Sequence, residues 1–244
     1  MNAFDLKGKT VLITGASSGL GRQTAITCSE YGAKVVITGR DAARLDETFW
    51  SLQGEGHRQI LANLTIQEEI DHLVSELPTL DGVVHSTGIS ELSPARFITK
   101  EFLDRTFSIS FNASVLLTAG ILGKKRLAKG NSSIVFISSI STRYPFVGGA
   151  MYISAKAALE AYARVLALEL AARGTRVNCI APAFVSTPML KETAENFSQE
   201  AVDKIEARQL LGLGDPVDVA NTIVFYLSDA SKWVSATNLI LGGG

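Results

Sequence analysis

The chain has 244 residues, of which 46% are hydrophobic and 19% are charged, and its formal net charge is -1 at pH 7. A chain of this length buries roughly 70–75% of its unfolded surface, so a large core can form without disulfides or metals. The nearly neutral charge gives no overall attraction to nucleic acid or anionic lipid. We therefore expect neither a nucleic acid nor a membrane as partner.

The two cysteines and the N-terminal sequence bear on the compartment. Cys28 and Cys179 lie in apolar stretches, and their spacing matches no zinc site, so two buried thiols and no metal are expected. The first ten residues lack the apolar core of a signal peptide. No run of about 18 apolar residues is free of polar interruption. These features predict a cytoplasmic protein without a membrane-spanning helix.

Short runs rich in Val and Ile alternate with longer helical patterns along the chain. The expected strands, in chain order, are Thr10–Thr14, Lys34–Thr38, Arg58–Ala62, Gly82–His85, Ser133–Ser138, Arg176–Ile180 and Asn238–Leu241. The expected helices are Leu20–Tyr31, Ala42–Leu52, Gln67–Glu76, Glu101–Ala128, Ala150–Arg173 and Pro216–Leu227. Continuous apolar strands are typical of sheets covered by helices on both faces. The alternation predicts an α/β fold, in which residues 1–244 form a single domain around one doubly wound parallel sheet (a Rossmann fold) of about seven strands.

One segment, Thr187–Gly214, departs from this alternation. Its composition is helical, yet it lies between two expected strands and beside other loops. Spacing alone leaves two interpretations open: a mobile substrate-binding lid over residues 187–214, or an ordinary pair of surface helices.

The first strand runs into a glycine-rich turn, TGASSGLG, and a helix follows it. The first glycine of such a motif permits a tight turn, the second lets the backbone approach a pyrophosphate, and the third lets the helix pack closely on the strand. The helix N-terminus then offers N–H groups and partial positive charge to phosphates. The turn predicts dinucleotide binding at Gly15, Ser17, Ser18, Gly19, Leu20 and Gly21.

The end of the second strand bears on the choice of nucleotide. A site for NAD usually has an acidic residue here to hold the ribose 2′-hydroxyl, whereas an arginine suits a 2′-phosphate. This chain has Arg40, and Asp41 is expected to cap the next helix. Arg40 therefore predicts NADP(H) rather than NAD(H); the alternative is a solvated surface arginine.

Candidate reactive residues follow the fifth expected strand. Tyr152 and Lys156 are four residues apart, so they share one face of a helix. A nearby ammonium favours the ionised phenol and lowers its pKa. Ser139 follows a strand at the carboxyl edge of the sheet, where its hydroxyl can bond a substrate oxygen. Asn112 lies inside an expected helix and, taken alone, is structural.

Together these motifs resemble the short-chain dehydrogenase/reductase family, and within it the 3-oxoacyl-(acyl-carrier-protein) reductases. The likeness runs from TGASSGLG through SSIS, YISAK and VNCIAPAFVSTPM to the terminal glycines. The resemblance implies a catalytic role for four residues. Ser139 polarises the carbonyl, Tyr152 donates or accepts the proton, and Lys156 lowers the tyrosine pKa and holds the nicotinamide ribose. Asn112 anchors a water molecule that relays protons.

The resemblance also implies further contacts with the cofactor. Asn63 and Leu64 stand where the family holds adenine, usually with an aspartate at the first position. Pro182, Val185 and Thr187 belong to the turn that faces the nicotinamide carboxamide.

The clearest departure from the family follows the fourth expected strand. The usual Asn-Asn-Ala-Gly is replaced by His85-Ser86-Thr87-Gly88, so only the glycine of this motif is retained, and Gly88 is expected to contact the cofactor. A histidine pKa lies near neutrality, which makes His85 a possible acid or base. A buried, neutral, hydrogen-bonded histidine is the expectation we favour.

The function implied is that of an NADP(H)-dependent oxidoreductase, which transfers hydride between the nicotinamide and a carbonyl or secondary alcohol. The substrate is a small molecule, with a 3-oxoacyl thioester, a sugar and another ketone all open. The two long helices are expected to form a homodimer or homotetramer. The alternatives are a non-catalytic NADP(H)-binding regulatory or structural protein, and an epimerase or dehydratase that uses the cofactor transiently.

Overall fold

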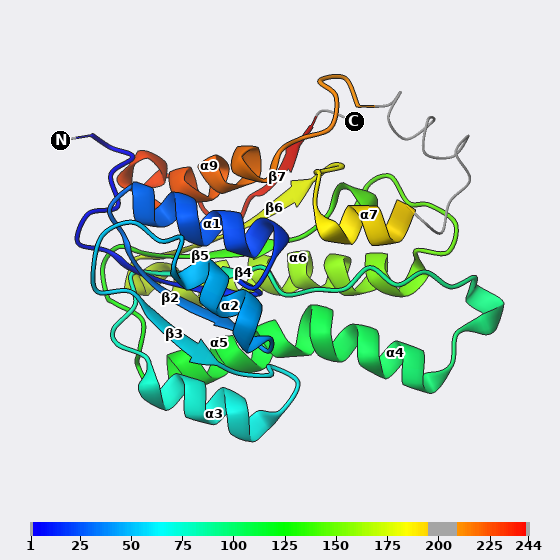
Figure 1. The fold of residues 1–244 in the computed structure, drawn as a ribbon, viewed down its shortest axis with the longest axis horizontal. Coiled ribbons are helices and arrows are strands. Elements are labelled where there is room, and N and C mark those ends of the chain that lie inside the picture. The colour runs from blue at the N-terminus through cyan, green and yellow to red at the C-terminus, as the bar shows by residue number, and fades with distance from the viewer. Residues whose placement is uncertain (1, 195–208, 243–244) are drawn as a thin grey trace.

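A computed structural model describes residues 2–194 and 209–242, and its centre is a single parallel sheet (Figure 1). The strands lie in the order β3-β2-β1-β4-β5-β6-β7. Their bounds are β1 Thr10–Thr14, β2 Lys34–Gly39, β3 Arg58–Leu61, β4 Gly82–His85, β5 Ser132–Ile137, β6 Thr175–Pro182 and β7 Asn238–Leu241. The predicted doubly wound α/β fold is confirmed, and each strand lies within two residues of its expected bounds.

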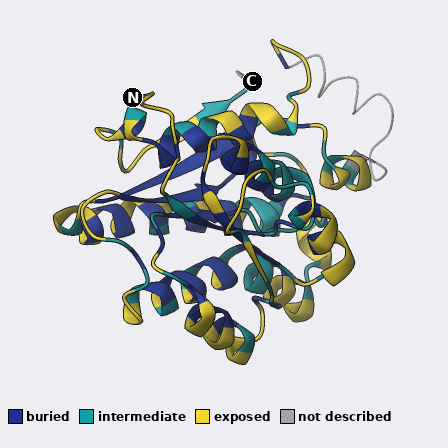
Figure 2. Ribbon diagram, turned by 60° about the vertical axis from the view of Figure 1, so that its left-hand side comes forward, coloured by how far each residue is buried: buried dark blue, intermediate teal, exposed yellow. Residues whose placement is uncertain are grey.

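Helices cover both faces of the sheet. They are α1 Gly19–Glu30, α2 Ala42–Phe49, α3 Gln67–Glu76, α4 Lys100–Phe107, α5 Ala113–Gly123, α6 Ala150–Leu170, α7 Pro188–Ala194 and α9 Pro216–Leu227. One apolar core joins the sheet to α1, α2 and α9, and a second joins it to α3, α5 and α6. Figure 2 shows the result: the strands at the centre are buried, whereas the helices expose their outer faces.

The strand order reverses between β1 and β4, which lie side by side although β2 and β3 separate them in sequence. Leu12 of β1 pairs with Val83 of β4, and Val84 of β4 pairs with Val135 of β5. Where the order reverses, the loops that follow the two strands diverge and leave a crevice at the carboxyl edge of the sheet. The glycine turn after β1 and the segment after β4 both lie at this crevice.

The expected helix Glu101–Ala128 is interrupted and ends early. A π-helical turn over Ser108–Asn112 separates α4 from α5, and α5 ends at Gly123. Lys125 has φ 55°, a left-handed conformation that cannot continue an α-helix. By length and composition Lys100–Gly123 could cross a membrane, with 24 residues and a mean hydropathy of 1.4. In the fold it packs against α3 and α6 as part of the second core.

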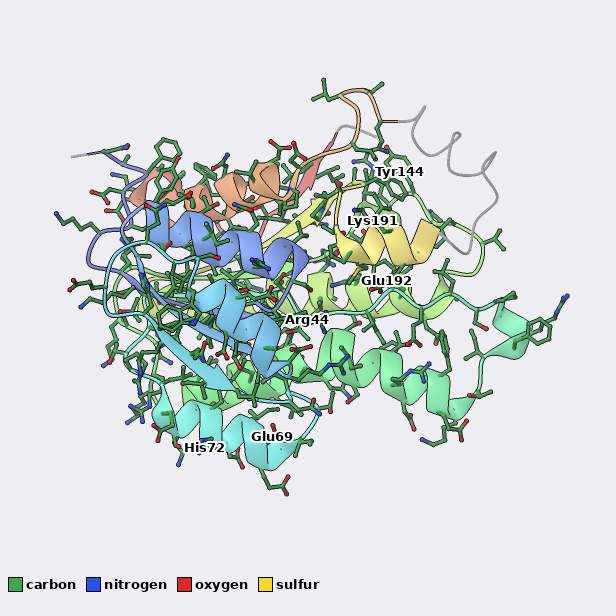
Figure 3. The ribbon with its side chains drawn as sticks, in the orientation of Figure 1. Arg44, Glu69, His72, Tyr144, Lys191 and Glu192 are labelled. Carbon is green, nitrogen blue, oxygen red and sulfur yellow. The ribbon has the colours of Figure 1, made fainter. Side chains whose placement is uncertain are left out.

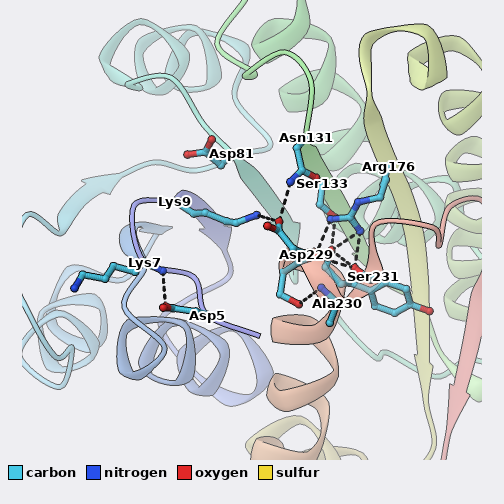
Figure 4. Close-up of polar contacts among 12 residues, drawn as sticks. Asp5, Lys7, Lys9, Asp81, Asn131, Ser133, Arg176, Asp229, Ala230 and Ser231 are labelled. Atoms are coloured by element: carbon cyan, nitrogen blue, oxygen red, sulfur yellow. Dashed lines mark hydrogen bonds and ion pairs between the residues drawn. The ribbon is translucent and has the colours of Figure 1, made fainter. Parts of the chain in front are cut away.

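A polar network closes the opposite, amino edge of the sheet (Figure 4). Arg176 is buried, and its guanidinium donates to the carbonyl of Tyr226 (2.7 Å), which lies in the last turn of α9. Asp229 accepts from Lys9 (2.9 Å) and from Asn131 (2.8 Å). Cations suit the C-terminal end of a helix. These contacts anchor α9 at this edge and leave the carboxyl edge for the site.

Two other expectations concern particular residues. Cys28 and Cys179 are confirmed as buried free thiols, and burial raises the pKa of each to about 12. The proposed lid over 187–214 is described only in part: α7 and the segment from Gln209 belong to it, while residues 195–208 lie outside the described residues.

Candidate active site

A cavity of about 1240 Å³ lies at the carboxyl edge and joins most of the predicted site residues. That volume exceeds a typical drug-sized pocket of about 300–1,000 Å³, which leaves room for a dinucleotide beside a small substrate. The predicted residues that line it are Gly15, Ser17, Ser18, Gly19, Leu20, Gly21, Arg40, Asn63, Leu64, Gly88, Ser139, Tyr152, Lys156, Pro182, Val185 and Thr187. The cavity is also lined by Tyr144, by Arg44 of α2 and by Glu192 of α7, all three of which are labelled in Figure 3.

The glycine turn adopts a shape that only glycine permits at two positions. Gly15 has φ 65°, and a Cβ there would lie 2.9 Å from the carbonyl oxygen of Ser86. A Cβ on Gly21 would lie 2.3 Å from the Gly15 carbonyl oxygen. Ser18 caps α1 without a side-chain hydrogen bond. The first N–H groups of α1 therefore face the cavity as a phosphate site.

Around Arg40 the cavity offers hydrogen-bond donors. The Ser17 hydroxyl is buried and has no hydrogen-bond partner among the described residues. It lies against Gly39, where a Cβ would approach the Ser17 oxygen to 2.2 Å. Asp41 caps α2 as predicted: its carboxylate accepts from the Arg44 backbone (3.1 Å) and guanidinium (2.7 Å), which lowers its pKa. Arg44 thus compensates the negative charge of Asp41 beside Arg40. Within the described part of the chain, the Arg40 guanidinium and the Ser17 hydroxyl are then free to donate hydrogen bonds, as a bound phosphate requires.

Asn63, which the family resemblance places against adenine, lines the cavity, and the oxygen of its amide is already hydrogen-bonded. Its Oδ1 accepts from the backbone N–H (3.2 Å) and the hydroxyl (2.9 Å) of Thr65. Its backbone N–H donates to Glu69, a residue of α3, at 2.6 Å. The loop after β3 is therefore held by hydrogen bonds to Thr65 and Glu69. The Nδ2 amide group of Asn63 is the group that can bond a nucleotide base.

Ser139, Tyr152 and Lys156 come together although two different elements carry them. Ser139 follows β5 and is 8% exposed, while the other two lie on α6, four residues apart. The Ser139 hydroxyl lies close enough to the Tyr152 phenol to lower the pKa of that phenol. Lys156 is 5% exposed, and its Nζ lies 5.9 Å from the centre of the Tyr152 ring. A substrate oxygen at this point can meet both hydroxyl groups at once.

The pKa shifts differ from the sequence-based expectation. Burial raises the pKa of the Tyr152 phenol, and the hydrogen bond with Ser139 opposes that rise. Burial lowers the pKa of Lys156 to about 8. Lys156 is not among the causes that shift the pKa of the Tyr152 phenol, and its ammonium donates to the Ile137 carbonyl at 2.8 Å. In this state the phenol is protonated and equipped to donate its proton.

The structure does not bring Asn112 to the site. Asn112 is exposed and does not line the cavity. Residues two apart point to nearly opposite sides of a helix, and the buried residue of this π-helical turn is Ser110. The Ser110 hydroxyl accepts from the Ile89 backbone N–H at 3.2 Å. Sequence reasoning missed Ser110, whose position depends on the π-helical turn.

Ser110 and Lys156 both lie close to Gly88. A Cβ on Gly88 would lie 3.1 Å from the Lys156 Nζ and 3.8 Å from the Ser110 Oγ. The lack of a side chain at Gly88 therefore leaves room for the Lys156 ammonium beside the cavity.

His85 is buried and neutral, as expected. It is 2% exposed, stacks on Phe136 with ring centres 4.7 Å apart, and has a pKa lowered by burial to about 3. Its Nε2 lies 2.9 Å from the Thr118 hydroxyl. Because it stacks on Phe136 of the second core and does not line the cavity, it is a packing residue.

The far end of the cavity is formed by β6 and the segment after it. Val185 bridges to Gly214, and the Thr187 hydroxyl accepts from the Leu190 N–H (3.3 Å) at the start of α7. Bulky side chains from several loops and from α7 also line the cavity: Ile89, Tyr144, Phe146, Phe184, Met189 and Leu190. No spacing in the sequence pointed to them, because the loops that bring them together are far apart along the chain.

Known proteins resemble the chain along nearly its whole length. Residues 15–244 match the family model described as enoyl-(acyl carrier protein) reductase. A 3-oxoacyl-(acyl-carrier-protein) reductase of Rickettsia felis is 32% identical over 241 residues, which is 99% of this chain and 98% of the relative.

Solved structures agree with this. A dehydrogenase/reductase from Sinorhizobium meliloti 1021 has a TM-score of 0.88 and 27% identity, covering 99% of this chain and 96% of the other. An actinorhodin polyketide ketoreductase variant, solved with NADPH, has a TM-score of 0.89 and 26% identity, covering 97% and 96%. Together with the glycine turn and the Ser139, Tyr152 and Lys156 cluster, these matches show that the chain belongs to the short-chain dehydrogenase/reductase family of oxidoreductases.

Proposed function

We propose that the protein reduces a ketone, or oxidises the corresponding secondary alcohol, with NADP(H) as the hydride carrier. One observation carries the proposal: Ser139, Tyr152 and Lys156 meet in the cavity that also holds the glycine turn and Arg40. NADP(H), when bound, supplies or accepts the hydride. The chain's own residues position the substrate and transfer the proton.

The proton transfer follows from the hydrogen-bonding groups of the site. The Tyr152 phenol, protonated because burial raises its pKa, donates a proton to the substrate oxygen in the reduction direction. The Ser139 hydroxyl, which donates to the Ser141 hydroxyl in this structure, turns to donate to the substrate oxygen instead and stabilises the charge that develops there. The Lys156 ammonium, which lies against Gly88 and 5.9 Å from the centre of the Tyr152 ring, adds positive charge near the phenol.

The preference for NADP(H) rests on three features of the adenine end. Arg40 lines the cavity, the Ser17 hydroxyl is buried without a described partner, and Asp41 is held by Arg44. An arginine can bind a phosphate through two parallel hydrogen bonds. An acidic residue free to accept from a ribose 2′-hydroxyl is what NAD requires, and Asp41 is already engaged.

The substrate is proposed to be a small ketone or secondary alcohol, with an acyl thioester and a sugar still open. The assembly is proposed to be a homodimer or homotetramer in the cytoplasm. Leu116 on α5, and Val165 and Leu168 on α6, expose 43%, 55% and 77% of their surface and offer apolar contacts to a second copy. We also propose that residues 1–244 act as one domain, whose 187–214 segment covers the substrate.

The deciding experiment compares wild type with Tyr152→Phe. Oxidation of NADPH is followed by the loss of nicotinamide absorbance across a panel of ketones, sugars and acyl thioesters, and NADPH binding is measured by fluorescence. We expect wild-type turnover on some of the panel, and loss of turnover with nearly unchanged NADPH affinity in the variant. Full turnover by the variant would refute the role of Tyr152, and wild type that binds NADPH without turning over any of the panel would favour a non-catalytic protein.

A further inference from the structure

A half-buried carboxylate, Glu160, lies behind the candidate catalytic residues and has no part in the proposed chemistry. It sits on α6 four residues after Lys156, so Tyr152, Lys156 and Glu160 form one stripe along the helix. Glu160 does not line the cavity. Its side chain nevertheless accepts hydrogen bonds from the segment that carries Ser139.

Glu160 holds this segment on both sides of Ser139. The Ser138 hydroxyl donates to Glu160 Oε1 at 2.5 Å, a length typical of a charge-assisted bond. The Thr142 hydroxyl donates to the same oxygen at 2.8 Å and lies 3.0 Å from the Ser139 carbonyl oxygen. One carboxylate oxygen therefore joins the residue before Ser139 to the residue three positions after it.

Within that closed segment the Ser139 hydroxyl is oriented. It donates to the Ser141 hydroxyl at 3.0 Å and accepts from the Ser141 backbone N–H at 3.2 Å. The same hydroxyl meets the Tyr152 phenol. The position of Ser139 relative to Tyr152 thus depends on how the segment is attached to α6, and Glu160 makes that attachment.

We propose that Glu160 is a positioning residue, which holds Ser139 in register with Tyr152 by joining Ser138 and Thr142 to the helix that carries the phenol. This inference rests on the proposed function. It predicts that loss of the carboxylate lowers kcat rather than the affinity for NADPH, because the cofactor does not meet this residue. A misplacement of about 1 Å can cost roughly a hundredfold in rate.

The test compares Glu160→Leu with Glu160→Gln, which keeps an oxygen acceptor. Glu169→Leu is the matched control, because Glu169 is an exposed carboxylate on the same helix. We expect kcat to fall by about tenfold to a hundredfold in Glu160→Leu and clearly less in Glu160→Gln. The control should stay at the wild-type rate, and all three variants should bind NADPH as wild type does. If Glu160→Leu does not fold, as judged by thermal unfolding, the double variant Ser138→Ala with Thr142→Val replaces it, with the same expectation.

A double-mutant cycle separates positioning from a general structural role. If Glu160 acts through Ser139, then adding Glu160→Leu to Ser139→Ala should change kcat by less than about twofold, because residues that act as a unit are not additive. Wild-type kcat in Glu160→Leu, or a full additional loss on top of Ser139→Ala, would overturn the proposal. Unchanged turnover in Ser139→Ala alone would instead refute the proposed function.

Discussion

The Lys156 ammonium donates to the Ile137 carbonyl at 2.8 Å, and through this bond α6 is joined to the end of β5. The next residue, Ser138, is bonded to Glu160, and Ser139 to Tyr152. Three consecutive residues, the last of β5 and the two that follow it, are thus each joined to α6. The Ser139 and Tyr152 hydroxyls are therefore placed by the attachment of the end of β5 to α6.

The pKa of Lys156 predicts a pH dependence for cofactor capture. Burial lowers this pKa to about 8, so the ammonium is charged below that pH and becomes neutral as the pH rises through it. Because kcat/KM for NADPH reports groups that titrate in the free protein, it should be flat near neutral pH and fall above about 8. In Lys156→Arg the cation stays charged, and the fall should vanish from the residual activity. A flat wild-type profile through this range would rule out Lys156 as the titrating group.

Arg40 predicts discrimination between the two nicotinamide cofactors. Arg40→Ala removes the cation placed for the 2′-phosphate, and a charge-assisted hydrogen bond contributes about 1.5–3 kcal/mol. The dissociation constant for NADPH should therefore rise about tenfold to a hundredfold while that for NADH changes little. Arg22→Ala is the matched control, since Arg22 is paired with Glu47 at 3.1 Å outside the cavity. Equal weakening of both cofactors in Arg40→Ala would show that Arg40 does not read the 2′ position.

Ser110 and Asn112 should respond differently to truncation. Ser110→Ala leaves the Ile89 N–H without its acceptor, and an unpaired buried donor costs about 1–3 kcal/mol. We expect a lower free energy of unfolding and a lower kcat, because Gly88 and Lys156 share this corner. Asn112→Ala should change the stability by no more than about 0.5 kcal/mol, as exposed positions do. Urea unfolding and steady-state rates measure both. A large loss of kcat in Asn112→Ala, with no loss in Ser110→Ala, would show that Asn112 takes part in proton transfer as the family resemblance implies.

The parts of the site that sequence could predict are those that follow from local rules. The glycine turn lies between a strand and a helix, Asp41 caps the next helix, and Tyr152 and Lys156 share a helical face, so their placement needs no knowledge of distant contacts. The role of Asn112 came only from the family resemblance, which could not show the π-helical turn that buries Ser110 and leaves Asn112 exposed. Glu160 escaped notice because its partners, Ser138 and Thr142, come from another element.

His85 predicts a pH dependence of stability. The Thr118 hydroxyl donates to the Ser114 carbonyl (2.7 Å), so it must accept from His85 Nε2–H. That leaves Nδ1 unprotonated and without a hydrogen-bond partner among the described residues. Burial lowers the pKa of His85 to about 3, whereas an unfolded chain has an ordinary histidine. Above that ordinary pKa of about 6.5 the group is neutral in both states and stability does not depend on it.

As the pH falls from about 6.5 toward 3, the unfolded state binds a proton that the folded state does not, so the free energy of unfolding should fall by up to about 1.4 kcal/mol per pH unit from this group. In His85→Gln, which keeps a donor for Thr118 but cannot titrate, the slope should be shallower by that amount even if the variant is less stable overall. His72→Gln is the control, because His72 is exposed on α3, and its slope should match that of wild type. Urea unfolding between neutral and mildly acidic pH measures the slopes. Equal slopes in wild type and His85→Gln would mean that the folded protein takes up a proton at His85 as readily as the unfolded chain, in conflict with its burial against Phe136.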